Sequence, residues 1–190
     1  MRNLRFIVID GLDASGKDTQ ARIVQERYQR RGERVIVRSH PAEDNWLGRM
    51  AKAALLGRGK INHLKASIFY ALDVLRSLGK YYNRKCDTLI MVRYLMGTAY
   101  LPSPLDRLAY RFFRTLLPSS RFMFFLDVTP EECLRRIGGR EIREAFENYE
   151  AIVRVRKKAL ALASDGWHVI NADLPVEKVA AAIEKILDSR

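Results

Sequence analysis

The stretch Phe6-Ile-Val-Ile-Asp-Gly-Leu-Asp-Ala-Ser-Gly-Lys-Asp-Thr-Gln20 decides how the rest of this sequence is interpreted. A continuous apolar run ends at Asp10, and Gly11, Gly16 and Lys17 then follow the G-x-x-x-x-G-K spacing of a phosphate-binding loop. Small residues let successive backbone N–H groups converge on phosphate oxygens, and the next helix adds the positive end of its dipole. The stretch therefore predicts a strand, a phosphate-binding loop and a helix.

The last position of this pattern departs from it. A phosphate-binding loop ordinarily has Ser or Thr after its lysine, to hold magnesium, and this chain has Asp18. Lys17 is expected to reach the β- and γ-phosphates of a nucleotide. The Asp18 carboxylate either takes over magnesium binding, because a hard cation prefers oxygen ligands, or is a first-turn residue favoured by the helix dipole. Asp10 and Asp13 flank the loop, and Asp10 is either a magnesium ligand or a turn residue at the strand end.

Composition and charge limit the class of protein. The 190 residues are 48% hydrophobic and 29% charged, which is typical of a soluble globular chain with one domain over 1–190. The net charge of +12 suits an anionic partner, or belongs to a solvated basic surface. Cys86 and Cys133 lack metal-ligand spacing, which favours a reducing compartment. No apolar run approaches the roughly 20 residues that span a bilayer, so we expect a cytoplasmic protein without membrane contact.

Strands and helices are predicted to alternate along the chain. Continuous apolar runs predict buried strands at residues 4–10, 35–37, 88–92, 122–128 and 167–170. Apolar stripes bounded by Gly and Pro predict helices at residues 16–31, 47–56, 62–82, 105–117, 130–138, 141–163 and 175–188. The alternation predicts an α/β fold with a five-stranded parallel sheet, helices on both faces, and ligands beyond the carboxyl ends of the strands.

The order of motifs resembles the thymidylate kinase family of P-loop nucleoside monophosphate kinases over nearly the whole chain. The matching segments are Asp10-Gly-Leu-Asp-Ala-Ser-Gly-Lys17 with Thr19-Gln20, Val92-Arg93-Tyr94 with Gly97-Thr98-Ala99-Tyr100, Phe124-Phe-Leu-Asp-Val-Thr-Pro130, and Arg135-Arg136 through Arg140, Arg143 and Phe146-Glu147. The resemblance implies a P-loop NTPase three-layer sandwich with a helical lid at about 135–150. It also implies ATP and magnesium as cofactors, phosphorylation of dTMP to dTDP, and a homodimer. Nucleic acid is not expected as a partner.

The resemblance and the residue chemistry together assign roles to individual residues. Donor-nucleotide binding is expected from Gly11, Asp13, Ala14, Ser15, Gly16, Lys17, Asp18, Thr19 and Arg136. Catalysis is expected from Lys17, Arg93, Arg140 and Arg143. Acceptor binding is expected from Asp10, Pro41, Lys52, Phe69, Tyr70, Arg93 and Tyr100. Magnesium is expected at Asp10 and Asp18. The competing interpretations are a structural ion pair for Arg93, a solvated face for the lid arginines and core packing for Phe69 and Tyr70.

Three departures from the family pattern leave alternatives open. The family has Thr after the loop lysine, Asp before the arginine of the third strand, and an arginine on the long helix that meets the thymine base. This chain has Asp18, Val92 and Val74 at those places, and Arg76 faces another side of the helix. The alternatives are a kinase for a different nucleoside monophosphate and a catalytically degenerate nucleotide-binding P-loop protein.

Overall fold

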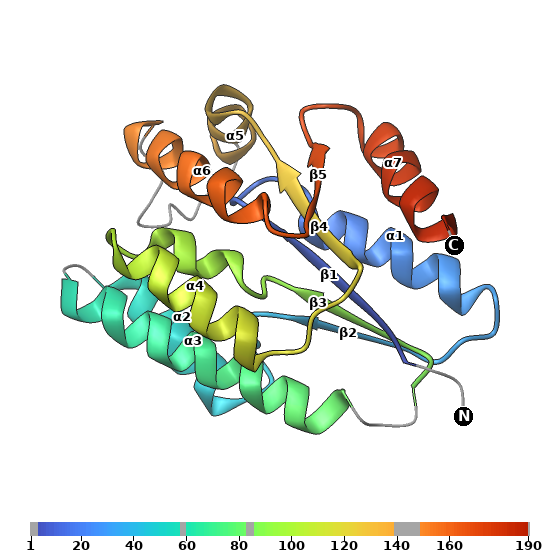
Figure 1. Ribbon diagram of the computed structural model, residues 1–190, viewed down its shortest axis with the longest axis horizontal. Coiled ribbons are helices and arrows are strands. Elements are labelled where there is room, and N and C mark those ends of the chain that lie inside the picture. Colours follow the sequence, from blue (N-terminus) through green and yellow to red (C-terminus); the bar gives the residue numbers. More distant parts are fainter. Residues whose placement is uncertain (1–3, 58–59, 83–85, 139–148, 190) are drawn as a thin grey trace.

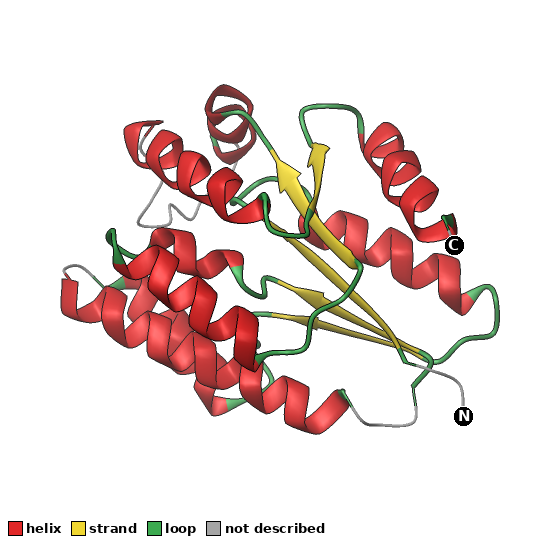
Figure 2. Cartoon of the chain, viewed as in Figure 1, coloured by secondary structure: helices red, strands yellow, loops and turns green. Residues whose placement is uncertain are grey.

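A computed structural model describes residues 4–57, 60–82, 86–138 and 149–189 of the chain (Figure 1). Its centre is a sheet of five parallel strands in the order β2-β3-β1-β4-β5, and Figure 2 shows the helices around it. The strands are β1 (Arg5–Gly11), β2 (Val35–Ser39), β3 (Thr88–Val92), β4 (Phe122–Asp127) and β5 (His168–Asn171). The predicted α/β fold with a five-stranded parallel sheet is confirmed.

β1 lies in the middle of the sheet, and its position explains its unbroken apolar run. Ile7, Val8 and Ile9 are fully buried, and Ile9 is in register with Val92 on β3 and Phe124 on β4. A parallel strand covered on both faces has no solvent side, so polar and apolar residues do not alternate along it. Burying each such side chain contributes about 1.5–3 kcal/mol, which fixes β1 as the base of the loop that follows it.

Helices pack on both faces of the sheet, as Figure 1 shows. On one face lie α1 (Lys17–Gln29) and α7 (Val176–Asp188), and on the other lie α3 (Lys60–Tyr81), α4 (Leu105–Leu116) and α6 (Tyr149–Ala163). α2 (Trp46–Leu56) packs on α3, and α5 (Pro130–Ile137) packs on α6. Helix, sheet and helix form the three predicted layers.

Most predicted boundaries agree with the structure to within two residues. β2 continues past Val37 to Ser39, because Arg38 and Ser39 keep pairing with β3 despite their polarity. The short 3₁₀ helix η1 (Met96–Tyr100) was not predicted. The helix predicted at 141–163 is described from Tyr149 onward, and the centre of the predicted lid, at 139–148, lies outside the described residues. Across the described segments, no helix has both the length and the apolar character that crossing a bilayer requires.

The carboxyl ends of neighbouring strands meet at one edge of the sheet. β1 ends at Gly11, β2 at Ser39 and β3 at Val92, and the backbone N–H of Arg93 donates to Ile9 O at 3.2 Å. Open α/β sheets bind their ligands beyond this edge. The loops that leave these three strands therefore provide the candidate site.

Candidate active site

The loop between β1 and α1 has the compact shape that its glycines predict. A Cβ on Gly11 would lie 2.7 Å from both Leu126 O and Ser15 Oγ, so no larger residue fits there without displacing its neighbours. Gly16 has a left-handed backbone (φ +83°) and caps the N-terminus of α1, which begins at Lys17. These two glycines let the loop fold back over the helix N-terminus, where backbone N–H groups are available to an anion.

Lys17 is buried, and its ammonium group is held by the loop itself. Nζ donates a 2.8 Å hydrogen bond to Leu12 O and lies 3.6 Å from Asp13 Oδ1. Burial lowers the pKa of Lys17, the charge of Arg93 lowers it further, and the Asp13 carboxylate opposes both effects. The cation is thus already positioned at the loop, with weak partners that a phosphate oxygen would replace.

Asp10 anchors the chain that follows β3. Its Oδ2 accepts backbone hydrogen bonds from Tyr94, Leu95 and Met96 at 2.7, 3.1 and 3.0 Å, and its Oδ1 accepts one from Gly11 at 2.9 Å. Burial raises the pKa of this carboxyl group, and these backbone donors pull it back down. Four donors occupy most of the acceptor sites of one carboxylate. The geometry therefore favours the strand-end turn role for Asp10 over the predicted roles in magnesium and acceptor binding.

Arg93 brings a second cation to the loop from the end of β3. Its backbone is left-handed (φ +58°), an unfavourable conformation for a residue with a Cβ, and strain of this kind clusters at functional sites. Nη2 lies 3.7 Å from Asp13 Oδ1, and Nη1 lies 3.3 Å from Asp18 Oδ2. Burial alone would lower the pKa of Arg93, but the carboxylates of Asp18 and Asp13 outweigh burial and raise it. The two carboxylates therefore hold the Arg93 guanidinium at the phosphate-binding loop.

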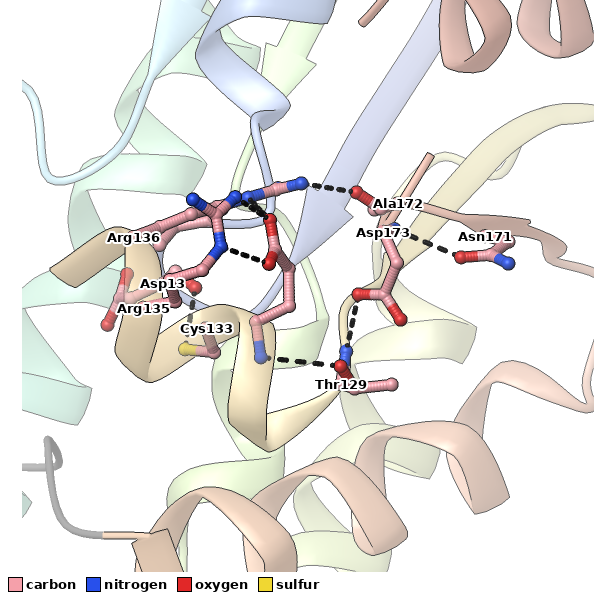
Figure 3. Close-up of polar contacts among 10 residues, drawn as sticks. Asp13, Thr129, Cys133, Arg135, Arg136, Asn171, Ala172 and Asp173 are labelled. Atoms are coloured by element: carbon pink, nitrogen blue, oxygen red, sulfur yellow. Dashed lines mark hydrogen bonds and ion pairs between the residues drawn. The ribbon is translucent and has the colours of Figure 1, made fainter. Parts of the chain in front are cut away.

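α5 is tied to the phosphate-binding loop through Arg136, as Figure 3 shows. Nη1 of Arg136 donates to Ala14 O at 3.1 Å, Nη2 donates to Ala172 O at 2.9 Å, and Nε donates to Glu132 Oε1 at 2.7 Å. Cys133 Sγ also donates to Asp13 O at 3.2 Å. The predicted donor-nucleotide residue Arg136 thus lies against the loop and joins it to the end of β5.

Aromatic side chains from α3 and η1 lie beside Arg93. Burial raises the pKa of Tyr70 and of Tyr100 well above the usual range, and the Arg93 charge partly opposes the shift in both. The Tyr70 hydroxyl group is buried without a hydrogen-bond partner in the described part of the chain. Phe69, next along α3, packs edge-to-face on Trp46 with ring centroids 5.6 Å apart. The structure therefore brings Tyr70 and Tyr100 to the predicted acceptor side.

The remaining predicted site residues are less closely connected to the loop. Thr19 is half-buried in the first turn of α1, and Pro41 is half-buried two residues after β2. Lys52 is exposed on α2 and pairs with Glu43 at 2.5 Å, so in this conformation its charge faces a carboxylate of the protein. Arg140 and Arg143, predicted to be catalytic, lie outside the described residues.

A family model described as thymidylate kinase matches residues 9–183. The chain belongs to the thymidylate kinase family. A probable thymidylate kinase of Pyrobaculum calidifontis is 30% identical to it over 96% of this chain and 95% of that protein. One from Thermococcus onnurineus is 28% identical over 92% of each. A solved structure of thymidylate kinase from Candida albicans superposes with a TM-score of 0.75 at 18% identity, covering 98% of this chain and 92% of that one, which supports the P-loop NTPase fold.

Within this thymidylate kinase fold, the structure adds residues that the sequence analysis missed. Ser39 Oγ donates a 2.9 Å hydrogen bond to Asp18 Oδ1 and lies 3.3 Å from Arg93 Nη1. Trp46 is 58% exposed beside Phe69. A polar residue at the carboxyl end of a predicted strand was a usable signal for Ser39, because such residues face the ligand edge. An isolated Trp before an apolar helix gave no comparable signal for Trp46.

Asp73 is another residue whose structural role the sequence analysis missed. It is fully buried on α3 and accepts hydrogen bonds from the Ala42 backbone N–H at 2.7 Å and from Asn45 Nδ2 at 2.8 Å. Asn45 in turn caps α2 by accepting from the Gly48 backbone N–H at 3.1 Å. A carboxylate between two apolar neighbours, Leu72 and Val74, was the available signal. Asp73 fixes the loop that leads from β2 to α2.

Proposed function

We propose that this chain transfers the γ-phosphate of ATP to dTMP, giving ADP and dTDP. The observation that supports this most directly is the meeting of two cations at Asp13: Lys17 Nζ lies 3.6 Å and Arg93 Nη2 lies 3.7 Å from the same Oδ1. One cation belongs to the donor-binding loop and the other to the end of β3. Phosphoryl transfer needs both phosphates held close together with their charge neutralised, and little covalent chemistry. The choice of dTMP as the acceptor rests on membership of the thymidylate kinase family.

The proposed roles follow from which element carries each residue. The backbone of the loop, from Gly11 to Thr19, would bind the phosphates of ATP, and Lys17 would neutralise charge on the transferring group. Arg93 would release Asp13 and Asp18 and bind the phosphate of dTMP through bidentate hydrogen bonds. Arg136, held against Ala14 O, would stiffen the loop around the donor. Arg140 and Arg143 remain proposed lid residues.

Magnesium is proposed as the metal of the reaction, where it would offset negative charge on the β- and γ-phosphates. The available residues fit such an ion: Asp18 is exposed in the first turn of α1, and Asp13 adds a second carboxylate nearby. Magnesium in kinases uses one or two protein carboxylates together with substrate phosphates, so a larger cluster of acidic ligands is not required. Asp18 is the preferred protein ligand, with Ser39 orienting its carboxylate.

The acceptor base is proposed to bind beside the aromatic residues of α2 and α3. Phe69 and Trp46 offer aromatic faces, and the unpartnered Tyr70 hydroxyl group offers a donor and an acceptor. Val74, at the place of the base-reading arginine of the family, is buried in the core and does not replace it. Thymine would therefore be recognised by stacking and by tyrosine rather than by a guanidinium group.

A single assay tests this reaction. Purified protein receives ATP, magnesium and each of a panel of nucleoside monophosphates, and the diphosphates formed are measured. Highest kcat/KM for dTMP is the expected result; a clear preference for another monophosphate, or no turnover with any acceptor despite ATP binding, would overturn it. Lys17→Ala is expected to reduce kcat by at least about 100-fold, whereas Lys178→Ala on α7 leaves it unchanged.

A homodimer through exposed apolar residues is proposed as the assembly. α3 and α4 lie on the same face of the sheet (Figure 1). Each of these helices carries a stripe of exposed apolar residues at helical spacing. The residues are Ile68, Leu72, Leu75, Leu105, Leu108, Phe112 and Leu116, each at least 38% exposed. An apolar surface of this extent favours burial against a second copy. A reducing, cytoplasmic setting is proposed with it, supported by the free thiols of Cys86 and Cys133.

A further inference from the structure

A cavity lies between α4 and α6, and its lining shares no residue with the phosphate-binding loop. Its volume is about 520 Å³, within the range of small-molecule sites. Four cationic residues line it, Arg107 and Arg111 from α4 and Lys157 and Lys158 from α6, against two carboxylates, Asp106 and Asp165. The cavity therefore has an excess of positive charge and is large enough for more than a single inorganic ion.

Three of these cations differ from the other basic residues on the same helices. Arg114 pairs with Asp165 at 3.7 Å, Arg154 with Glu150 at 3.5 Å, and Arg156 with Asp127 at 2.7 Å. Arg107, Arg111 and Lys157 are exposed at the cavity and have no carboxylate partner within the described segments. Carboxylates neutralise the neighbouring cations and leave these three available.

Hydrogen bonds and an ion pair connect the residues of the inner wall of the cavity. Asp106 is only 2% exposed; its Oδ2 accepts from Ser103 Oγ at 3.0 Å and lies 3.7 Å from Lys158 Nζ. Lys158 also donates to Leu101 O at 2.7 Å, so its charge is already engaged. Tyr110 Oη accepts from Trp167 Nε1 at 2.8 Å. The inner residues are fixed by one another, which leaves the three rim cations to contact a ligand.

We propose that this cavity binds a small molecule that carries a chain of two or three phosphates. Arg107 and Arg111 are neighbours one helical turn apart on α4, and Lys157 lines the same cavity from α6, so the three cations suit a ligand with more charge than one phosphate carries. Guanidinium groups form bidentate hydrogen bonds with phosphate oxygens, and Lys157 adds a point charge. A concave opening suits a small ligand better than a nucleic acid strand, for which exposed stacking aromatics along a groove are expected.

Tryptophan fluorescence reports directly on this cavity. Trp167 is hydrogen-bonded to Tyr110, which lines the cavity, and the Trp46→Phe substitution removes the emission of the exposed indole on α2. The background protein also carries Lys17→Ala, which weakens phosphate binding at the loop. Inorganic tripolyphosphate is then titrated at constant ionic strength. A saturable change in Trp167 emission is expected.

Two triple variants, compared in this background, test whether tripolyphosphate binds in the cavity between α4 and α6. The first is Arg107→Gln with Arg111→Gln and Lys157→Gln, and it should raise the Kd for tripolyphosphate at least about tenfold, equivalent to roughly 1.4 kcal/mol. The second is Arg22→Gln with Lys178→Gln and Lys185→Gln, exposed basic residues on α1 and α7, and it should change Kd less than about twofold. Thermal melts confirm that both variants fold.

Three results would overturn the proposal. One is an unchanged Kd in the α4–α6 variant. Another is equal weakening in both variants, which would indicate the net charge of the protein rather than a site. The third is a single-stranded oligonucleotide that binds through the same three cations while tripolyphosphate does not. The titration is independent of phosphoryl transfer, and the α4–α6 triple variant without Lys17→Ala is expected to keep its turnover in the absence of tripolyphosphate.

Discussion

Ser39 Oγ donates a hydrogen bond of 2.9 Å to Asp18 Oδ1 and so joins the carboxyl end of β2 to the first turn of α1. Arg93 Nη1 lies 3.3 Å from both of these side chains. A hydroxyl group and a carboxylate therefore stand together beside Lys17, although the position after Lys17 carries no Ser or Thr. The hydroxyl group comes from a neighbouring strand and the carboxylate from the loop's own helix.

The first prediction concerns this pair. Asp18→Ala is expected to weaken magnesium-dependent ADP binding about tenfold, because it removes the carboxylate that we propose as the magnesium ligand. Ser39→Ala is expected to have a smaller effect, since it removes only the group that orients the carboxylate. Asp18→Thr is expected to retain binding, because a hydroxyl group at this position is the usual magnesium ligand. Calorimetric titration of ADP at several magnesium concentrations measures each effect without turnover.

A matched control separates metal binding from helix stability. Glu177 occupies the first turn of α7, as Asp18 does in α1, and Glu177→Ala removes the same favourable interaction with a helix dipole. Asp18→Ala should cost somewhat more stability than Glu177→Ala, because it also loses the Ser39 hydrogen bond and the Arg93 ion pair, and only Asp18→Ala should alter the magnesium dependence. If Asp18→Ala binds magnesium and ADP normally, Asp18 is merely a first-turn residue.

The second prediction is a pH dependence at α5. Glu132 accepts hydrogen bonds from Arg135 and Arg136, which lower its pKa to about 2, from an unfolded value of 4.5. A lowered folded pKa means that the stabilisation is complete above pH 4.5 and is lost as the pH falls towards about 2. The Tm difference between the wild type and Glu132→Gln should therefore be constant from about pH 6 to pH 8 and shrink below pH 4.5.

The variant Glu131→Gln provides the comparison for this pH dependence. Glu131 lies on the same helix, and its bond from the Tyr149 hydroxyl group lowers its pKa, but it does not contact Arg136. Only Glu132→Gln should also weaken ADP binding, because Arg136 would lose the partner that aims it at Ala14 O. A Tm difference at Glu132 that stays the same down to pH 3 would contradict the argument.

The fold was predictable from sequence because its signals are local. The apolar run before Gly11 and the glycine spacing after it predict β1 and the loop, and the structure gives both. The contacts within the site were not predictable to the same degree. Ser39, Asp18 and Arg93 are brought together by the order of the strands, in which β3 lies between β1 and β2. The pattern of strand pairing, rather than any single motif, decides such contacts.

Asp10 is a second example of a site contact that could not be predicted from the sequence. An aspartate at the end of a buried strand next to a phosphate-binding loop is a reasonable magnesium ligand by residue type. The structure instead directs three consecutive backbone N–H groups, from Tyr94 to Met96, onto its Oδ2. That turn is left-handed at Arg93, a conformation that sequence spacing does not reveal.

The third prediction tests the proposed dimer. Phe112 is 61% exposed in the apolar stripe of α4, and Leu72 is 42% exposed in that of α3. Phe112→Glu and Leu72→Glu should each raise the dimer Kd at least about tenfold, because a carboxylate would be desolvated at the interface. Leu174→Glu changes a residue that is 40% exposed outside both stripes and should not affect assembly. Sedimentation velocity over a concentration series measures the dimer Kd of each protein. A wild-type protein that is monomeric throughout the series would contradict the prediction.

The fourth prediction concerns the fixed loop between β2 and α2. Asp73→Ala leaves the Ala42 backbone N–H and Asn45 Nδ2 without their acceptor in a buried place, which should cost about 2–4 kcal/mol of unfolding free energy. Asp73→Asn keeps one acceptor oxygen and should cost less. Lys65→Ala, at an exposed position of the same helix outside the apolar stripe, should cost under about 1 kcal/mol. Urea denaturation monitored by circular dichroism measures all three, and equal costs for Asp73→Ala and Lys65→Ala would contradict the prediction.

α4 is a surface helix whose sides carry three different kinds of residue. Asp106 and Tyr110 point into the protein, Arg107 and Arg111 line the cavity shared with α6, and the exposed stripe that includes Phe112 covers the third side. Exposed helix positions ordinarily tolerate most substitutions. A saturation mutagenesis screen scored by growth should therefore find the exposed positions of α4 more restrictive than the equally exposed outer face of α7. Natural variation in this protein should follow the same division.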